Sequence, residues 1–253
     1  MGWPDLRWNI LVGYAPLFAQ GLAMTLGLTV VSLTGGLGLG ILLGLVSSSV
    51  DSPRPASPVT AALWQLLRLV TRAYVGFFRG TPLFVQILLV HFAVMPLLIQ
   101  PDGGLLLSGE PAREFRQNHG AFFSGALALT LNAGAYISEI LRAGIQSIHG
   151  GQTQAAYSVG LTHAQSMRYV ILPQALRRMV PALVNEAVTL VKDSSLVSAI
   201  GLAELALAAR TVAGAYSRYW EPYLFISAIY LVITLTLSSL AKRLEAPAHL
   251  RGR

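Results

Sequence analysis

Three polar side chains stand in otherwise apolar runs, where burying them is costly. Asn132 lies within the run 121–143, and Glu186 and Asp193 lie within the run 180–205. A charge at membrane depth costs at least about 2–3 kcal/mol, so it normally faces a cavity or a partner inside a helix bundle. A carboxylate in such a place can attract an ammonium group, which makes Glu186 and Asp193 candidates for lining a solute route. The alternative is structural, with interhelical hydrogen bonds or ion pairs that fix packing.

A longer polar segment follows the third apolar run, and its pattern suits contact with a partner. The spacing predicts a short helix over Gln152–Val159, a break at Gly160 and a second short helix over His163–Val170. Thr162 is expected to cap the second helix, and Pro173 to lie near the start of the next long helix. The segment is therefore expected to form two short helices joined by a tight bend.

The small side chains of this segment set its expected shape. Gly150 and Gly151 are expected to end the preceding long helix, since glycine is the usual residue just past a helix end. Ala155 and Ala156 would give the first short helix a shallow apolar face, which fits a groove on another protein. An ordinary loop is the alternative interpretation.

The residues that would support catalysis or metal binding do not cluster in the sequence. The chain has no cysteine, which excludes disulfides, thiolate metal sites and cysteine nucleophiles. No glycine-rich phosphate loop of the GxxxxGK[ST] type occurs, so any ATP chemistry must come from another subunit. The sequence therefore predicts a protein that is not an enzyme, with no catalytic or metal site and no cofactor of its own.

The composition is that of a polytopic membrane protein. Of the 253 residues, 54% are hydrophobic and only 11% are charged, with a mean hydropathy of +0.59. A soluble domain is about 25% charged, so this chain has too few charges to cover a globule. The net charge of +7 comes from basic residues spread along the chain, which argues against nucleic acid as a partner. The fold class expected is an all-α bundle that crosses a lipid bilayer, with one domain over 1–253.

Apolar runs long enough to cross a bilayer define about five spans. An amphipathic helix over 60–78 and a polar loop over 101–119 separate some of them, and the two-helix segment joins spans three and four. The expected spans are 18–46, 82–99, 121–143, 180–205 and 222–240, with the connecting segment at 146–175.

The distribution of basic residues predicts orientation. Most lysines and arginines fall in segments that share one side, including Arg142, Arg168 and Lys242. Because such residues concentrate on the cytoplasmic side, the amino terminus is expected outside and the carboxyl terminus inside. The connecting segment then lies in the cytoplasm.

Several motifs together resemble those of permease subunits of bacterial ABC importers. The polar segment is similar to their cytoplasmic E-A-A loop, and other stretches resemble the permeases for polar amino acids (the histidine, glutamine, glutamate, arginine and opine group). The similarity covers most of residues 18–240. The motifs are Phe78–Leu83, Asn132–Ile140, Gln154–Ala156, Gly160, Val170–Pro173, Leu172–Ala175 and Lys192–Val197.

This resemblance implies a function and a set of partners. The loop would dock into a cleft on an ABC ATPase dimer, which binds ATP and Mg²⁺, and would transmit its closure to a permease that works by alternating access. A second permease copy or a paralogue, a soluble extracytoplasmic amino-acid-binding protein and the bacterial inner membrane complete the expected assembly. The coupling residues implied are Gln154, Ala155, Ala156, Gly160, Leu161, His163 and Arg168.

One departure and two alternatives accompany this interpretation. The family usually has glutamate where this chain has Gln154, so docking must rely on shape more than on that charge. A secondary transporter or channel subunit for small polar solutes is the alternative, although no internal repeat is evident. A membrane enzyme is a further alternative, but the sequence shows no convergent catalytic constellation.

Overall fold

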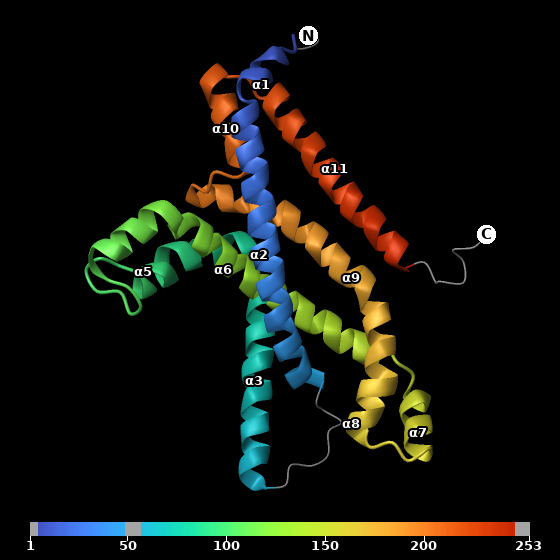
Figure 1. Ribbon diagram of the computed structural model, residues 1–253. Helices are drawn as coiled ribbons and strands as arrows, with labels where there is room; N and C mark the ends of the chain where they lie inside the picture. The colour runs from blue at the N-terminus through green and yellow to red at the C-terminus, as the bar shows by residue number, and fades with distance from the viewer. Residues whose placement is uncertain (1–4, 49–56, 246–253) are drawn as a thin grey trace, which may run out of the picture. The chain divides into compact units, whose positions relative to one another are not determined.

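Helices account for the named elements of the chain (Figure 1). The computed structural model describes residues 5–48 and 57–245, and the side chains of residues 5–47 and 57–240. Within these ranges a single parallel bridge joins Ile99 and Leu107, and every named element is helical. The helices are α1 (Asn9–Gly13), α2 (Ala15–Ser48), α3 (Pro58–Gly80), α4 (Leu83–Leu89), α5 (Met95–Leu98), α6 (Gly109–Gln146), α7 (Gly150–Ser158), α8 (His163–Ser166), α9 (Leu172–Asp193), α10 (Leu205–Tyr216) and α11 (Trp220–Glu245), with π-turns η2 (Val90–Val94) and η3 (Met167–Ile171) and the 3-10 helix η4 (Ser194–Ile200).

The all-α membrane fold expected from the sequence is confirmed. Among the described residues, three helices are long and apolar enough to cross a membrane, at Ala15–Ser47, Gly109–Gln146 and Trp220–Leu240. Two bent pairs raise the number to five if each pair counts as one span: Pro58–Gly80 with Leu83–Leu98, bent by 110°, and His163–Ile200 with Leu205–Tyr216, bent by 52°. The single-domain assignment and the exact span limits stay predictions.

Two helical segments differ from the expected ones. The polar loop expected over 101–119 is shorter, because α6 already begins at Gly109. The expected span 180–205 is not one helix. It is α9 up to Asp193, then the η4 turn, then Gly201 at φ +86°, which stops the helix before α10 begins. Glycine tolerates this left-handed conformation, so Gly201 is a local cause of the break.

Each π-turn ends two residues before a proline. Pro96 and Pro173 have no N–H to donate to the carbonyls four residues earlier, at Phe92 in η2 and Tyr169 in η3. Local π geometry is a common way to accommodate such a missing bond. The sequence position of each proline thus accounts for the irregular turn next to it.

By residue contacts, the described chain divides into two compact units. The first comprises the described parts of Met1–Leu33, Leu83–Leu129 and Ala187–Leu237. The second comprises those of Thr34–Pro82, Thr130–Glu186 and Ser238–Arg253.

The second unit is held together by a glycine face on α2. Added methyl groups at Gly36, Gly40 and Gly44 would lie 2.8, 2.6 and 2.4 Å from Ala133, Ile137 and Leu141 of α6. The contacting residues are spaced four apart on both helices, so each of these glycines of α2 faces one side chain of α6. The glycines therefore allow these two helices to approach closely, as small residues do in membrane helix pairs generally.

The first unit contains a carboxylate that is fully buried. Glu204 has no exposed surface, and its oxygens accept hydrogen bonds from Ala206 N (2.9 Å) and Leu207 N (2.8 Å) at the start of α10. The Tyr230 hydroxyl donates to it at 3.1 Å, and Thr25 approaches at 3.4 Å. Because the carboxylate caps a helix N-terminus inside an apolar unit, its polarity is satisfied from three elements.

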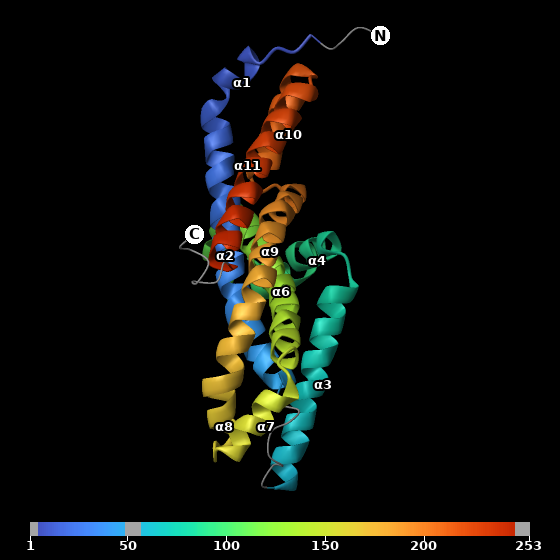
Figure 2. The same cartoon turned by 90° about the vertical axis from the view of Figure 1, so that its right-hand side faces the viewer.

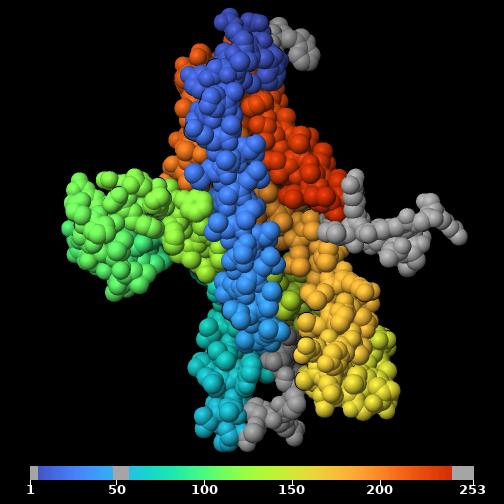
Figure 3. Space-filling view, in the orientation of Figure 1, coloured from blue at the N-terminus to red at the C-terminus, as the bar shows by residue number. Residues whose placement is uncertain are grey.

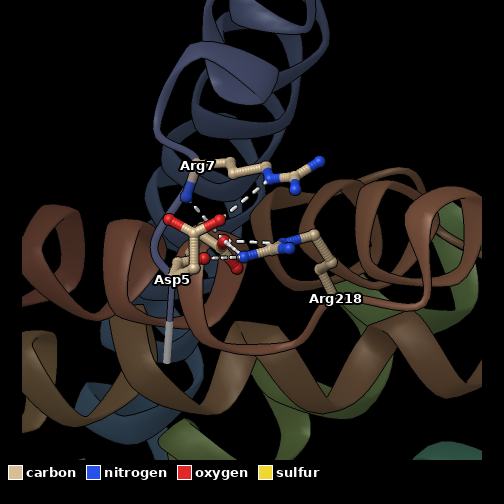
Figure 4. A network of polar contacts seen from close by, with 4 residues as sticks. Asp5, Arg7 and Arg218 are labelled. Atoms are coloured by element: carbon tan, nitrogen blue, oxygen red, sulfur yellow. Dashed lines mark hydrogen bonds and ion pairs between the residues drawn. The ribbon is translucent and has the colours of Figure 1, made fainter. Parts of the chain in front are cut away.

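A second polar network of the first unit ties the amino-terminal residues to the start of α11 (Figure 4). Glu221 is 2% exposed, accepts from Arg7 N at 2.9 Å and pairs with Arg218 at 2.7 Å. Arg218 also donates to the Asp5 carbonyl. The network is structural, because each of its charged groups is matched by a partner within the network.

Candidate functional site

The connecting segment forms the two short helices that its sequence predicts, within the second unit. In Figures 1 and 2, α7 and α8 lie side by side. One expectation is wrong: Gly150 and Gly151 do not end the preceding helix, which stops at Gln146. They begin α7, because His149 caps it, with Nδ1 accepting from Gly151 N at 3.1 Å.

Gly160 ends α7 in the way that its residue type suggests. Its φ is +84°, Gly160 N donates to Tyr157 O at 3.0 Å, and Leu161 N donates to Ala156 O at 3.1 Å. This pair of bonds is the Schellman arrangement, which needs a residue in the left-handed conformation. The break predicted at Gly160 is confirmed. The backbone N–H of Leu161 makes one of the two bonds that end the helix.

The second short helix is closed by a reciprocal cap. Thr162 Oγ1 accepts from Gln165 N at 3.3 Å, and Gln165 Oε1 accepts from Thr162 N at 2.8 Å. The cap predicted at Thr162 is confirmed, although α8 passes into η3 after Ser166. His163 Nδ1 lies 2.9 Å from the Tyr157 hydroxyl, which joins α8 to α7.

The segment rests on a small apolar cluster. Ile148, Ile171, Ala175 and Met179 are buried together beneath it. Two polar contacts add to this support. Arg178 donates to the Ser147 carbonyl, and Gln174 Nε2 donates to Gln152 Oε1 at 3.3 Å. The two helices are therefore fixed from α6 and α9, and motion of these long helices would carry the segment with them.

Only one of the two alanines of the segment, Ala155, points outward. Gln154, Ala155 and Arg168 are exposed, but Ala156 is only 4% exposed and packs inward. Neighbouring residues on a helix point about 100° apart, so Ala155 and Ala156 cannot share one outward face. Figure 3 shows the segment in yellow at the surface.

Three large apolar side chains of the segment are also exposed and were not singled out from the sequence. Val159 is 76% exposed, Tyr169 64% and Tyr157 45%. Their irregular spacing offers no periodic signal by which the sequence could have identified them. The Arg168 guanidinium lies 5.7 Å from the ring centre of Tyr169, so a positive charge lies over one of these exposed rings.

The three candidate route residues lie in different environments. Asn132 is buried and its Nδ2 donates to the Phe78 carbonyl at 3.2 Å, the interhelical bond that the structural alternative expected. Glu186 is half-buried in α9 in the second unit. Asp193 is half-buried at the end of α9, in the first unit. Within each described unit no cluster of three His, Asp or Glu side chains suits a metal ion.

Charged side chains near the carboxyl end of α6 form an ion pair. Arg142 binds the Glu139 carboxylate through two nitrogens, one of them at 2.9 Å, and Arg79 lies 3.9 Å from the same carboxylate.

A family comparison decides what kind of protein carries this segment. The model described as "Binding-protein-dependent transport system inner membrane component" matches residues 55–247. The chain belongs to this family. It is therefore a membrane component of a binding-protein-dependent transporter, and membership implies an ATPase partner and a substrate-binding protein.

Individual relatives agree with this membership. The arginine transport system permease protein ArtQ of Bacillus subtilis is 35% identical over 242 residues, covering 95% of this chain and 96% of ArtQ. The glutamine transport system permease protein GlnP of Escherichia coli is 34% identical over 238 residues, covering 94% and 95%. The family expected from the motifs is confirmed.

Solved structures show the same fold. An amino acid ABC transporter crystallised with histidines contains a chain of 38% identity and TM-score 0.75, with 96% of this chain and 99% of that chain covered. The MetNI methionine ABC transporter in an inward-facing conformation reaches a TM-score of 0.62 at 20% identity, covering 90% and 96%, which bears on the fold alone.

Proposed function

We propose that this permease carries polar amino acids inward, driven by a separate ATPase. The support is the identity of about one third, over nearly the whole chain, with relatives named for arginine, glutamine and glutamate/aspartate transport. The permease has no ATP site of its own in this proposal. ATP and Mg²⁺ are bound by an ATPase dimer, and the chain is not an enzyme.

The coupling site in this proposal is the α7–α8 segment. Its exposed residues Gln154, Ala155, Gly160 and Arg168 would contact the ATPase cleft, and Ala156, Leu161 and His163 would hold the shape. Because Gln154 is neutral, this contact would depend on shape complementarity and not on a charge at that position. The firm attachment of the segment to α6 and α9 supports a role in passing movement into the helices.

The route through the membrane would be formed with a second permease, either an identical copy or a paralogue. Glu186 and Asp193 would each provide negative charge for the ammonium group of the solute, and Asn132 is the third residue assigned to the route. The amino terminus outside and the carboxyl terminus in the cytoplasm follow from the bias of basic residues. The membrane is the bacterial inner membrane, which agrees with the family description.

Reconstitution tests this function directly. The permease is placed in proteoliposomes with its ATPase and binding protein, and ATP hydrolysis is measured across a panel of amino acids, sugars and metal ions. Stimulation by polar amino acids alone is the expected result. Stimulation by sugars or metals, without any by amino acids, contradicts the proposed substrate class.

The route residues are tested in the same assay. Asp193→Asn and Glu186→Gln should each lower amino-acid-dependent transport while leaving the ATPase attached. Transport at the wild-type rate in both variants would remove them from the route.

A further inference from the structure

The first helix of the coupling segment begins at an unusual cap. Helix α7 starts at Gly150, and the residue before it, His149, has an extended backbone at φ −60° and ψ 133°. Its Nδ1 atom accepts a hydrogen bond from Gly151 N at 3.1 Å. The common capping side chains, those of Ser, Thr, Asp and Asn, offer an oxygen that does not lose its acceptor character near neutral pH. A histidine cap differs from them because its acceptor nitrogen can take up a proton.

The charge on His149 therefore decides whether this cap exists. The backbone N–H of Gly151 can only donate, so Nδ1 must keep a free lone pair, and an imidazolium ring has none because both of its nitrogens carry hydrogen. Protonation also places a positive charge at the start of α7, where the helix dipole favours a negative one. Histidine is the side chain that ordinarily changes charge between about pH 5 and 8. The cap is thus present while the ring is neutral and is lost as the pH falls.

The other polar contacts of the segment do not depend on protonation in this way. His163 Nδ1 lies 2.9 Å from the Tyr157 hydroxyl, which can donate to a neutral ring or accept from a charged one. The cap of α8 joins Thr162 and Gln165, neither of which titrates. Of the two described caps of the segment, the one at α7 is therefore the one that acid removes.

The surroundings of His149 offer no carboxylate to offset the added charge. Its side chain is exposed to solvent, and residues 146–175 contain no Asp or Glu. In the last two turns of α6, Glu139 is already bound by Arg142 through two nitrogens. The charged and titratable side chains on the adjoining parts of α6, α7, α8, η3 and the first two turns of α9 are Glu139, Arg142, Tyr157, His163, Arg168, Tyr169, Arg177 and Arg178.

We propose that His149 makes the coupling segment sensitive to acidification of the cytoplasm, because protonation of its ring releases the start of α7 and weakens docking to the ATPase. This inference rests on the proposed contact between the α7–α8 segment and the ATPase. Gln154 and Ala155 lie in the second turn of α7, directly after the turn that the cap holds. Acid thus lowers the coupling of ATP hydrolysis to transport by loosening one short helix.

Binding of the ATPase subunit to the full-length permease in lipid nanodiscs tests the proposal. Affinity is measured by fluorescence titration at about pH 7.5 and about pH 5.5, on either side of the ordinary histidine range. The wild type should bind about fivefold more weakly at the lower pH, as expected for the loss of one helix cap. In H149N, whose amide oxygen caps at both pH values, the ratio of the two affinities should stay within about twofold. H119N, which removes an exposed histidine of the first unit, is the control and should keep the wild-type ratio.

Two further variants make the test independent of any one substitution. H149S supplies another cap that does not titrate and should behave as H149N does. H149A has no acceptor at either pH, so its affinity at about pH 7.5 should already be about fivefold below that of the wild type and should fall little further on acidification. Amide hydrogen exchange over Gly150–Ser158, corrected for the intrinsic effect of pH, should report the same loss of protection in the permease alone.

Two results would overturn the proposal. One is a wild-type affinity that is the same at both pH values. The other is a pH response that persists unchanged in H149N and H149S, which would place the titrating group elsewhere, for example on the ATPase. A permease that binds the ATPase equally well after deletion of residues 151–166 contradicts the proposed coupling site itself, whatever His149 does.

Discussion

Two helix starts in this permease are capped by side chains in opposite environments. At α8, Thr162 and Gln165 cap each other at the surface. At α10, Glu204 is fully buried and takes bonds from the helix backbone, from Tyr230 and from Thr25. The exposed cap is made by its own neighbours in sequence, whereas the buried one depends on residues from distant parts of the chain.

This difference separates two kinds of polar residue in a membrane protein. A surface cap shapes a segment that another protein contacts, and its loss lets water replace the missing bond. A buried cap holds elements together, and its loss leaves donors unpaired in an apolar interior. Substitutions in the buried Glu204 network should therefore lower the stability of the protein more than substitutions in the exposed α7–α8 segment.

The largest effect is expected from Glu204→Ala. The change leaves the N–H groups of Ala206 and Leu207 and the Tyr230 hydroxyl without their acceptor, at a cost of about 3 kcal/mol. Thermal unfolding of the detergent-solubilised protein measures it. Glu204→Gln keeps one acceptor oxygen and should lose less. A melting temperature equal to that of the wild type would show that the buried network contributes nothing.

The next effect is expected from Gly160→Ala. Alanine at φ +84° costs about 1–2 kcal/mol, which should loosen the bend between α7 and α8. Gly150→Ala, at the first residue of α7 with open space around it, is the matched control. ATPase co-purification should fall for the first variant only. Equal behaviour of the two variants would remove the bend from the docking surface.

A smaller effect is expected from Thr162→Ala. Loss of the reciprocal cap costs about 1 kcal/mol. Thr153→Ala, within α7, removes the same hydroxyl without touching a cap. Protease sensitivity of the 146–175 segment reports the local change. A loss as large as that of Glu204→Ala would contradict the distinction between exposed and buried caps.

The smallest effect is expected from Tyr157→Phe. The change removes only the exposed bond to His163, worth less than about 1 kcal/mol. Tyr169→Phe keeps that bond and serves as the control. Both variants should melt close to the wild type, and a large loss in the first would place this bond among the structural ones.

Local signals in the sequence predicted most of the coupling segment. Gly160, Thr162 and Pro173 act through the backbone of their own neighbours, so their roles follow from residue type and spacing. The inward turn of Ala156 could not be predicted, because it depends on which side of α7 meets the cluster beneath it. The predicted start of α7, at Gln152, is two residues too late, because His149 is an unusual cap and the two glycines after it begin the helix.

Contacts between residues far apart in the chain could not be predicted from the sequence. Glu204 lies in an apolar run next to a break, and nothing local shows that Tyr230 and Thr25 surround it. Arg72 and Arg142 line one cavity of the second unit although they lie about 70 residues apart, which no local pattern shows. The glycines of α2 recur at four-residue spacing in the sequence, but nothing local shows that α6 packs against them.

The central claim is that the α7–α8 segment contacts the ATPase, and site-specific crosslinking tests it most directly. The chain has no native cysteine, so Ala155→Cys and Val159→Cys each provide one reactive thiol on the exposed face. Leu105→Cys, equally exposed but in the first unit, is the control. With a short thiol-to-amine crosslinker, the assembled transporter should give a permease–ATPase product at 155 and 159 and none at 105. Labelled thiols at 155 and 159 that yield no such product, or a product of equal yield at 105, would contradict the claim.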